Sequence, residues 1–213
     1  MSSLLDLSAL TDVAERLVGA AHRAGADAAD ALAVRSVSLG VEVREGAVEE
    51  SERSEGDDLG LRVFVGRRQA VVSTNDIKVD ISQLAERAVA MAKAAPEDHF
   101  TGLADPGLLA RAIPDLDLLD PALPSVGELE ERAHRAEAAA LGVKGVTKSG
   151  GASASAGIGG MVLITSAGFR GSYLSSGQSL SMTAIAGEGG AGAGRRSADP
   201  GGAGVCMIIR SAW

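Results

Sequence analysis

The sequence predicts an α+β fold of antiparallel sheets and amphipathic helices, and three observations support this prediction. Apolar residues recur with helical spacing in three separate segments. Other segments alternate apolar and polar residues, as half-buried strands do. The links between successive strand segments are too short for the crossover that a parallel pair requires. Helices followed by runs of antiparallel strands are typical of α+β proteins.

The composition indicates a folded protein whose core is built from small and aliphatic side chains. Hydrophobic residues make up 46% of the 213 positions, aromatic residues only 2%, and there are 28 glycines. The formal net charge of −8 disfavours binding along a phosphate backbone, so we expect no direct nucleic-acid partner. A single cysteine, no signal-like start and no long apolar run lead us to expect a cytoplasmic protein that does not enter a membrane.

The first half of the chain predicts a helix followed by a meander. Helical apolar spacing runs from Leu10 to Ala21, and Gly25 offers a stop. Residues 31–73 are then expected to form antiparallel strands. The segments within this meander are a half-buried strand at 36–44, a turn at Glu45-Gly46, a polar strand at 47–53, an acidic loop at 54–58, a strand at 59–65, a turn at Gly66-Arg67 and a strand at 69–73.

The second half of the chain predicts two more helices and further strands. Asp80 is a candidate cap for a helix that Pro96 ends, and residues 96–124 carry five of the six prolines, as expected of a linker without regular structure. Ser125 and Glu128 have capping-box spacing before a third helix that stops at Gly142. Strand candidates follow at 144–156, 160–166 and 169–186, separated by Gly159-Gly160 and by residues 166–168.

The order of these elements suggests an internal duplication. A helix, a glycine stop and antiparallel strands occur from Leu10 and again from Ser125, so a duplicated helix-plus-meander unit is possible. We expect four segments: a helix, meander and helix subdomain at 1–95, an Asp/Pro-rich linker at 96–124, a helix with antiparallel strands at 125–190, and a divergent tail at 191–213.

No catalytic, cofactor or metal-binding residue can be assigned from motifs. The three histidines, His22, His99 and His134, have no partner at metal-ligand spacing, and His99 is expected in a solvated turn. The sequence GEGGAG at 187–192 matches G-x-G-x-x-G, but it opens no amphipathic helix that could hold a phosphate. Ser153 and Ser155 lie among small residues without a nucleophile motif.

An acidic cluster in the first meander is the strongest candidate binding feature. It faces only two arginines in the same stretch, and it could hold a divalent cation or a basic peptide. The simpler interpretation is a solvated edge whose charges prevent unwanted strand pairing. Both interpretations can hold, because such an edge can still accept one chosen strand. The cluster consists of Glu42, Glu45, Glu49, Glu50, Glu52, Glu55, Asp57 and Asp58, with Arg44 and Arg53.

The stretch VEVREGAVEESERSEGDDLGLRVFVGRRQAVVSTND at 41–76 closely resembles the N-terminal signature of the TldD/PmbA family, particularly its PmbA (TldE) branch. The helix LAERAVAMAKAAPED, the linker IPDLDLLDP and the segment LITSAGFRGSYLSSGQSLSMTAIAGEGG fit as well, so the resemblance covers about residues 6–190. Ala167 departs from the pattern, because the family usually has Asn in this turn, and alanine tolerates a positive φ less well.

The resemblance implies a role in a zinc metallopeptidase system of the TldD/TldE type, which processes peptides. In that family the TldD branch carries the zinc motif H-E-x-x-x-H, which is absent from this sequence. The resemblance therefore implies a non-catalytic N-terminal domain without a cofactor of its own, which forms part of a substrate chamber and binds an extended or unfolded peptide. Its partner would be a TldD-like subunit holding the zinc, or a second copy in a dimer. Two alternatives stay open: a regulatory module of the "modulator of DNA gyrase" type, and a nonfunctional fragment.

The tail at 191–213 contains both the only cysteine, Cys206, and the only tryptophan, Trp213. The family usually continues there with an acidic, Tyr-containing segment that leads into a C-terminal domain. We therefore expect a shifted reading frame or a truncated gene after about residue 190, with a naturally divergent terminus as the alternative.

Overall fold

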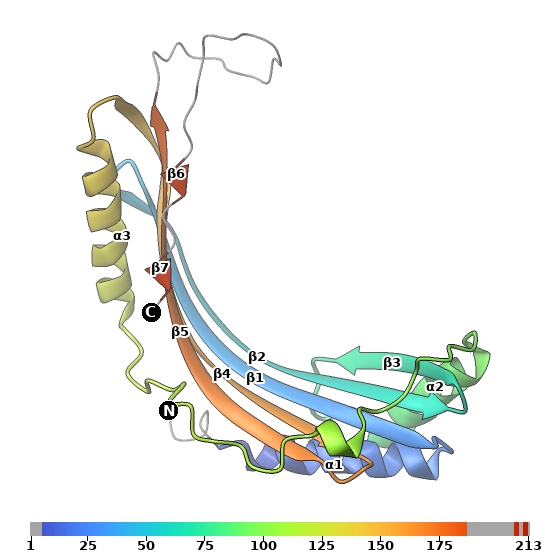
Figure 1. Ribbon diagram of the computed structural model, residues 1–213. Helices are drawn as coiled ribbons and strands as arrows, with labels where there is room; N and C mark the ends of the chain where they lie inside the picture. The colour runs from blue at the N-terminus through green and yellow to red at the C-terminus, as the bar shows by residue number, and fades with distance from the viewer. Residues whose placement is uncertain (1–5, 187–206, 209–210, 213) are drawn as a thin grey trace, which may run out of the picture. The chain divides into compact units, whose positions relative to one another are not determined.

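The computed structural model describes residues 6–186, 207, 208, 211 and 212. Five long strands form an antiparallel sheet in the order β3-β2-β1-β4-β5, with two-residue strands β6 and β7 paired to β5 (Figure 1). The elements are α1 (Ser8–Arg23), β1 (Ala28–Arg44), β2 (Ala47–Val65), β3 (Arg68–Thr74), α2 (Ile81–Ala94), a short 3-10 helix (Pro106–Leu108), α3 (Val126–Leu141), β4 (Val146–Thr165), β5 (Arg170–Ala186), β6 (Met207–Ile208) and β7 (Ser211–Ala212). The predicted α+β class is confirmed.

Contacts divide the chain into two compact units, and the division passes through four of the strands. The first unit comprises Met1–Val37, Glu55–Leu119 and Gly159–Ser175, and the second comprises Ser38–Ser54, Asp120–Ile158 and Ser176–Trp213. A helix followed by antiparallel strands occurs twice in the chain, as α1 before β1–β3 and as α3 before β4–β5. The predicted division of the chain into segments stays a prediction. Its segments are 1–95, 96–124, 125–190 and 191–213.

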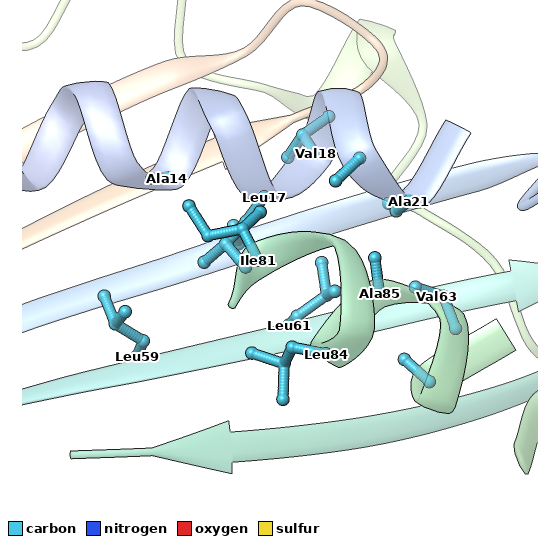
Figure 2. Close-up of a cluster of buried hydrophobic side chains, with 14 of the residues drawn as sticks. Ala14, Leu17, Val18, Ala21, Leu59, Leu61, Val63, Ile81, Leu84 and Ala85 are labelled. Carbon is cyan, nitrogen blue, oxygen red and sulfur yellow. The ribbon is translucent and has the colours of Figure 1, made fainter. Parts of the chain in front are cut away.

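The first unit is held together by α1 and α2, which contribute to the same apolar core as β2 (Figure 2). On α1 the buried residues follow helical spacing, and on β2 Leu59, Leu61 and Val63 are buried, with partly exposed residues between them, as expected of elements with one apolar face. On β1 the core positions Ala29, Ala31 and Ala33 are fully buried and small, which leaves room for the helices. The labelled residues in Figure 2 are Ala14, Leu17, Val18, Ala21, Leu59, Leu61, Val63, Ile81, Leu84 and Ala85.

The second unit packs α3 against parts of β1, β4 and β5. Leu129 and Ala133 of α3 are fully buried against a sheet face made largely of alanine and valine. Successive side chains of a strand point to opposite faces, so the alternating residues of β4 leave only small side chains toward the helix. The strand residues of this core are Leu39, Val41, Val43, Ala152, Ala154, Ala156, Met182 and Ala184.

The predicted helix boundaries are confirmed by the local hydrogen bonds. The Asp80 carboxylate accepts the backbone N–H groups of Ser82 and Gln83, so Asp80 caps α2. Ser125 and Glu128 form the predicted capping box at the start of α3. Beyond α1, Gly25 takes a left-handed φ of 99°, a conformation that favours glycine. Each of these starts and stops therefore has a local cause, a capping side chain for α2 and α3 and a left-handed glycine after α1.

Two predicted interruptions of the strands are wrong. The acidic segment 54–58, expected as a loop, lies inside β2, which continues from Ala47 to Val65 beside β1. Gly159-Gly160 does not divide β4, which runs unbroken from Val146 to Thr165. A Cβ on Gly160 would collide with the side chain of Leu7 and would lie 2.9 Å from Leu174 Cδ2, so this glycine allows close packing and does not end a strand.

The turn between β4 and β5 accommodates Ala167 without strain. The left-handed φ of 90° falls on Gly168 and not on Ala167. Thr165 closes the turn, because its Oγ1 accepts the Phe169 N–H at 3.1 Å. The linker 96–124 has no regular structure except the 3-10 helix Pro106–Leu108, close to the prediction. Among the helices of the described chain, none combines the length and the apolar character that crossing a bilayer requires.

Candidate functional site

The candidate site is the hairpin that β1 and β2 form in the second unit. Its turn contains only Glu45 and Gly46, which have φ angles of 52° and 75°. Two positive φ values in a two-residue loop are the mark of a type I′ turn, whose twist matches that of the strands it joins. Glycine adopts this conformation freely, but Glu45 does so at a cost in backbone strain. Something outside the turn must therefore stabilise it.

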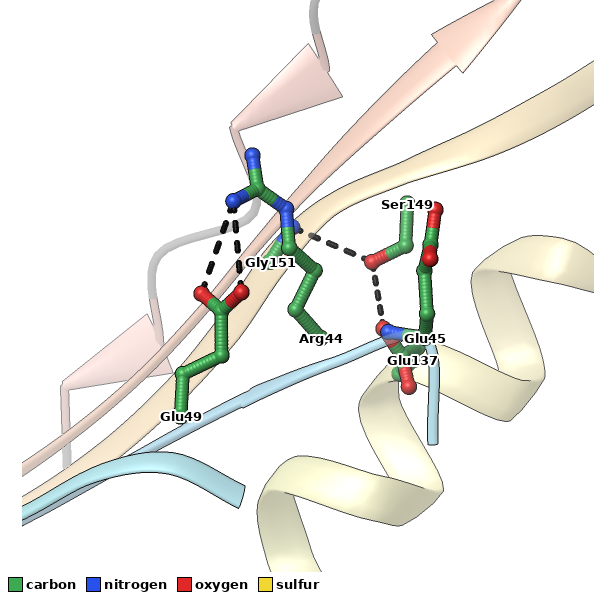
Figure 3. A network of polar contacts seen from close by, with 6 residues as sticks. All are labelled: Arg44, Glu45, Glu49, Glu137, Ser149 and Gly151. Atoms are coloured by element: carbon green, nitrogen blue, oxygen red, sulfur yellow. Dashed lines mark hydrogen bonds and ion pairs between the residues drawn. The ribbon is translucent and has the colours of Figure 1, made fainter. Parts of the chain in front are cut away.

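The Glu137 carboxylate on α3 supplies that stabilisation (Figure 3). It accepts the backbone N–H groups of Glu45 and Gly46, each at 2.8 Å, one on each oxygen. The Ser149 hydroxyl on β4 donates a third hydrogen bond to it, and Ser149 Oγ in turn accepts the Gly151 N–H at 3.1 Å. Glu137 is only 3% exposed, so these bonds satisfy a buried charge.

The hydrogen bonds also decide the ionisation of Glu137. Burial, the largest single influence, would raise the pKa of this carboxyl, because it disfavours the charged form. The bonds from Ser149, Gly46 and Glu45, with a smaller contribution from the charge of His134, together outweigh burial and hold the pKa below its ordinary value. Glu137 is therefore a carboxylate at neutral pH and suits an anchoring role rather than that of a general acid.

Glu137 belongs to no known sequence motif, although the sequence contains a signal for its role. Leu129, Ala133 and Glu137 are spaced by four residues and so share one face of α3. Glu137 is thus an acidic residue on an apolar stripe, which predicts a buried hydrogen-bonding partner.

Beyond the turn, β2 is an edge strand over residues 47–54. Its neighbours in the sheet are β1 and β3, and pairing with β3 begins only at Leu59, opposite Thr74. Every residue from Ala47 to Ser54 is exposed, so neither face of this segment is covered. We call residues 47–54 the free edge. On the side away from β1, no described strand pairs with this segment, so backbone N–H and C=O groups such as those of a sheet edge are available there.

The acidic residues of the predicted cluster are all on this hairpin and its continuation, but they do not converge on one point. Glu49 pairs with Arg44 at 3.3 Å, and Asp57 pairs with Arg35 at 2.6 Å. Glu50 and Glu52 have neither a hydrogen bond nor an ion pair with any described residue, and with Glu42 they line a shallow hollow of about 160 Å³. The cluster is therefore spread along the hairpin, with six of its eight acidic residues on β2.

Small hydroxyl side chains on β4 and β5 pair across the two strands. Ser153 Oγ lies 2.7 Å from Ser181 Oγ, and Ser155 Oγ lies 2.8 Å from Ser179 Oγ. Ser153 and Ser155 also line the hollow beside Glu50 and Glu52. No histidine is among these contacts, so the structure gives the serines a hydrogen-bonding role and no activating base.

Each histidine has a different neighbour. His22 Nδ1 is 3.2 Å from the Ala26 carbonyl, His134 is 3.7 Å from Glu130, and His99 contacts Arg67 in the exposed turn after α2. In the described part of the chain, no group of three His, Cys, Asp or Glu side chains is placed to hold a metal ion. The donors present do not fit zinc, so we assign none of them to it. GEGGAG, Cys206 and Trp213 lie outside the described residues.

An apolar cleft lies between α3 and β5 in the second unit. Its volume is about 310 Å³, and alanines on the helix leave it open above Leu180 and Met182. No charged or titratable side chain lines it, so the cleft could accommodate an apolar group but supplies no acid, base or metal ligand. Its lining residues are Ala136, Ala139, Ala140, Val143, Val146, Leu180, Ser181, Met182 and Ala184.

Comparison with known proteins places the chain in a family. Residues 29–92 match the family model of PmbA/TldA metallopeptidase domain 1, and residues 119–205 match that of the PmbA/TldA metallopeptidase central domain. The second match includes residues 191–205 of the tail that we expected to depart from the family pattern, and the disrupted reading frame stays a prediction.

Two curated relatives agree with these matches. The metalloprotease PmbA homolog of Haemophilus influenzae is 39% identical over 170 residues, which is 78% of this chain and 37% of the relative. Metalloprotease PmbA of Escherichia coli O157:H7 is 35% identical over 166 residues, which is 77% of this chain and 37% of the relative. The chain thus spans a little over a third of the length of these relatives.

Solved structures share the fold. A candidate modulator of DNA gyrase from Bacteroides thetaiotaomicron superimposes with a TM-score of 0.79 at 22% identity, over 95% of this chain and 44% of that one. TldE from Thermococcus kodakarensis gives a TM-score of 0.69 at 14% identity, over 94% of this chain and 42% of that one. The two family models together match most of the sequence, and the chain belongs to the PmbA/TldD metallopeptidase family.

Proposed function

We propose that this chain supplies the N-terminal portion of a PmbA/TldE-like subunit in a TldD/TldE-type zinc metallopeptidase system. It forms part of the wall of the substrate chamber, binds extended peptide by strand addition, and contacts a TldD-like subunit or a second copy. The match to domain 1 and to the central domain of the family carries this proposal. The names of the curated relatives, both metalloproteases, support a role in proteolysis.

In this proposal the chain does not catalyse hydrolysis by itself. The described residues provide hydrogen-bonding serines and an anchoring carboxylate, but no nucleophile paired with a base and no metal-ligand group. The zinc that activates water for peptide hydrolysis is therefore expected on a TldD-like partner.

The test uses the purified full chain, a TldD-like zinc subunit and an unstructured reporter peptide. We expect no cleavage by the chain alone, and a stable complex with the zinc subunit by size-exclusion chromatography with light scattering. Chelator-sensitive cleavage by the chain alone would show that the division of roles is wrong.

Two of the solved structures with this fold are described as candidate modulators of DNA gyrase, which favours a regulatory binding module as the second candidate. Purified gyrase serves as the competing partner in the same chromatography. A complex with gyrase, and none with the zinc subunit, would replace the first proposal with the second.

A further inference from the structure

We infer that the free edge of β2, residues 47–54, accepts a basic extended peptide segment as an additional strand of the sheet. This inference rests on the proposed peptide-binding function and assigns that function a place and a substrate class. The starting observation is the unpaired backbone: β2 has β1 on one side, and β3 reaches only as far as Leu59 on the other. An added strand would satisfy the exposed backbone groups, which is how sheet edges bind peptides.

The turn determines which backbone groups are available. A two-residue turn makes its flanking residues, Arg44 and Ala47, a hydrogen-bonded pair, and the backbone groups alternate in direction from there. The ion pair between Arg44 and Glu49 fits this register, because the two are diagonal neighbours across the hairpin. The N–H and C=O groups of Val48, Glu50 and Glu52 therefore point away from β1. Eight residues span about 26 Å, enough for a peptide segment of roughly six to eight residues.

The negative charge of the free edge indicates which kind of peptide would bind there. The free edge contains three acidic residues, Glu49, Glu50 and Glu52, and one basic residue, Arg53. The side chains of Glu50 and Glu52 form no ion pair with any described residue. A second copy pairing through the same edge would place these glutamates against each other, and like charges on neighbouring strands are destabilising. A strand with lysine or arginine at alternate positions would instead neutralise them. A basic segment is therefore the occupant that the edge favours.

The edge is held in place before a peptide arrives. Glu137 fixes the turn at one end of the segment through the N–H groups of Glu45 and Gly46, and pairing with β3 begins at Leu59 toward the other end. A strand that is already ordered loses less conformational entropy on binding, so more of the interaction energy with a basic peptide remains as affinity.

The experiment uses the full chain and two fluorescent eight-residue probes, one alternating lysine with threonine and one alternating glutamate with threonine. We expect anisotropy to show binding of the lysine probe that weakens at least threefold between 50 and 200 mM salt, on the order expected for exposed charges. The glutamate probe should bind at least tenfold more weakly. Equal binding of both probes, or no binding of the lysine probe, overturns the inference.

Variants separate the backbone from the charge. Glu50→Pro removes an outward N–H and obstructs strand addition, and we expect it to reduce affinity at least tenfold. Glu50→Ala retains the N–H and should reduce affinity only about two- to threefold, on the scale of one surface charge. The double variant Glu50→Gln/Glu52→Gln should remove much of the salt dependence. The matched control Glu86→Gln/Glu131→Gln removes two exposed charges elsewhere and should bind like the wild type.

Amide exchange measured by NMR on the wild-type chain does not depend on the folding of any variant. The lysine probe should slow exchange at Val48, Glu50 and Glu52, while the inward amides of Glu49 and Ser51 are protected already. Protection confined to another surface, or unchanged binding by Glu50→Pro, overturns the free edge as the site while leaving the family role intact. Chelator-sensitive cleavage by the chain alone overturns the proposed division of roles without affecting the edge, so the two failures are distinguishable.

Discussion

Replacing Glu137 by glutamine tests whether the carboxylate holds the β1–β2 turn. The wild-type side chain accepts two backbone N–H groups at 2.8 Å and the Ser149 hydroxyl. Glutamine retains one oxygen, but its NH₂ group must then face one of the turn N–H groups, donor against donor. A hydrogen bond to a charged group contributes about 1.5–3 kcal/mol. Because the turn residues are exposed and water can replace part of the loss, we expect a destabilisation of about 2 kcal/mol.

The assay is urea unfolding followed by circular dichroism, with Glu131→Gln on the exposed side of α3 as the control. For a chain of this length, about 2 kcal/mol corresponds to a Tm lower by roughly 4–8 °C. The control should stay within about 0.5 kcal/mol of the wild type. If Glu137→Gln unfolds at the wild-type urea concentration and the amides of Glu45 and Gly46 exchange at the wild-type rate, the carboxylate does not hold the turn.

The same variant tests the ionisation of Glu137 through pH. Its pKa in the folded chain is lowered, although burial acts in the opposite direction, so the unfolded chain binds the proton more tightly. The contribution of this group is complete above its ordinary pKa of about 4.5 and is lost as the pH falls through the lower folded value. The stability difference between wild type and Glu137→Gln should therefore shrink below about pH 4.5. A difference that grows on acidification contradicts this assignment.

The remaining predictions concern packing and capping. Leu129→Ala removes a fully buried side chain from a core otherwise rich in alanine, and urea unfolding should show a loss of about 3 kcal/mol. Gly150→Ala places a Cβ 2.7 Å from Thr183 Cγ2 and should lower the free energy of unfolding by about 1–3 kcal/mol. In the control Gly177→Ala the new Cβ meets no atom within 4 Å, so stability should not change. Equal Tm values for the two variants would contradict this packing. Ser125→Ala removes the α3 cap and should lower stability by about 1 kcal/mol, with reduced helix signal in circular dichroism.

The sequence was most informative where structure depends on local chemistry. The starts of α2 and α3 follow from side chains that accept N–H groups two or three residues away, and such caps are visible as Asp80 and as the pair Ser125 and Glu128. The hairpin turn follows from Glu45-Gly46 in the same way, because few residue pairs tolerate two positive φ values.

Strand continuity could not be predicted, because it depends on neighbours that are distant in sequence. Residues 54–58 look like a loop, with one glycine and three acidic side chains, but the backbone of β1 extends alongside them. Gly160 looks like a break, and only the approach of Leu7 and Leu174 explains why a side chain is excluded there. In both places tertiary contact overrides a local turn signal.

The candidate site was predicted in part. The sequence indicates the acidic residues and their place on a strand edge, which the structure has at residues 47–54, whereas resistance to self-pairing stays a prediction. The anchor was missed, because Glu137 is separated by about 90 residues from the turn it binds. An acidic residue at a core position of an amphipathic helix indicates a buried hydrogen-bonding partner, but it does not say which part of the chain supplies that partner.

The free edge combines an unpaired backbone with unpaired acidic side chains, and one ligand could satisfy both. Its backbone is unpaired on one side, and Glu50 and Glu52 lie on it without a partner among the described residues. With neither face buried, residues 47–54 contribute little hydrophobic stability, so their strand conformation depends on β1 and on the anchored turn. A basic peptide that pairs with the edge would satisfy the backbone and neutralise the charges together. Such a ligand should raise the Tm of the chain as its concentration increases, and less so in Glu137→Gln, where the turn that presents the edge is no longer held.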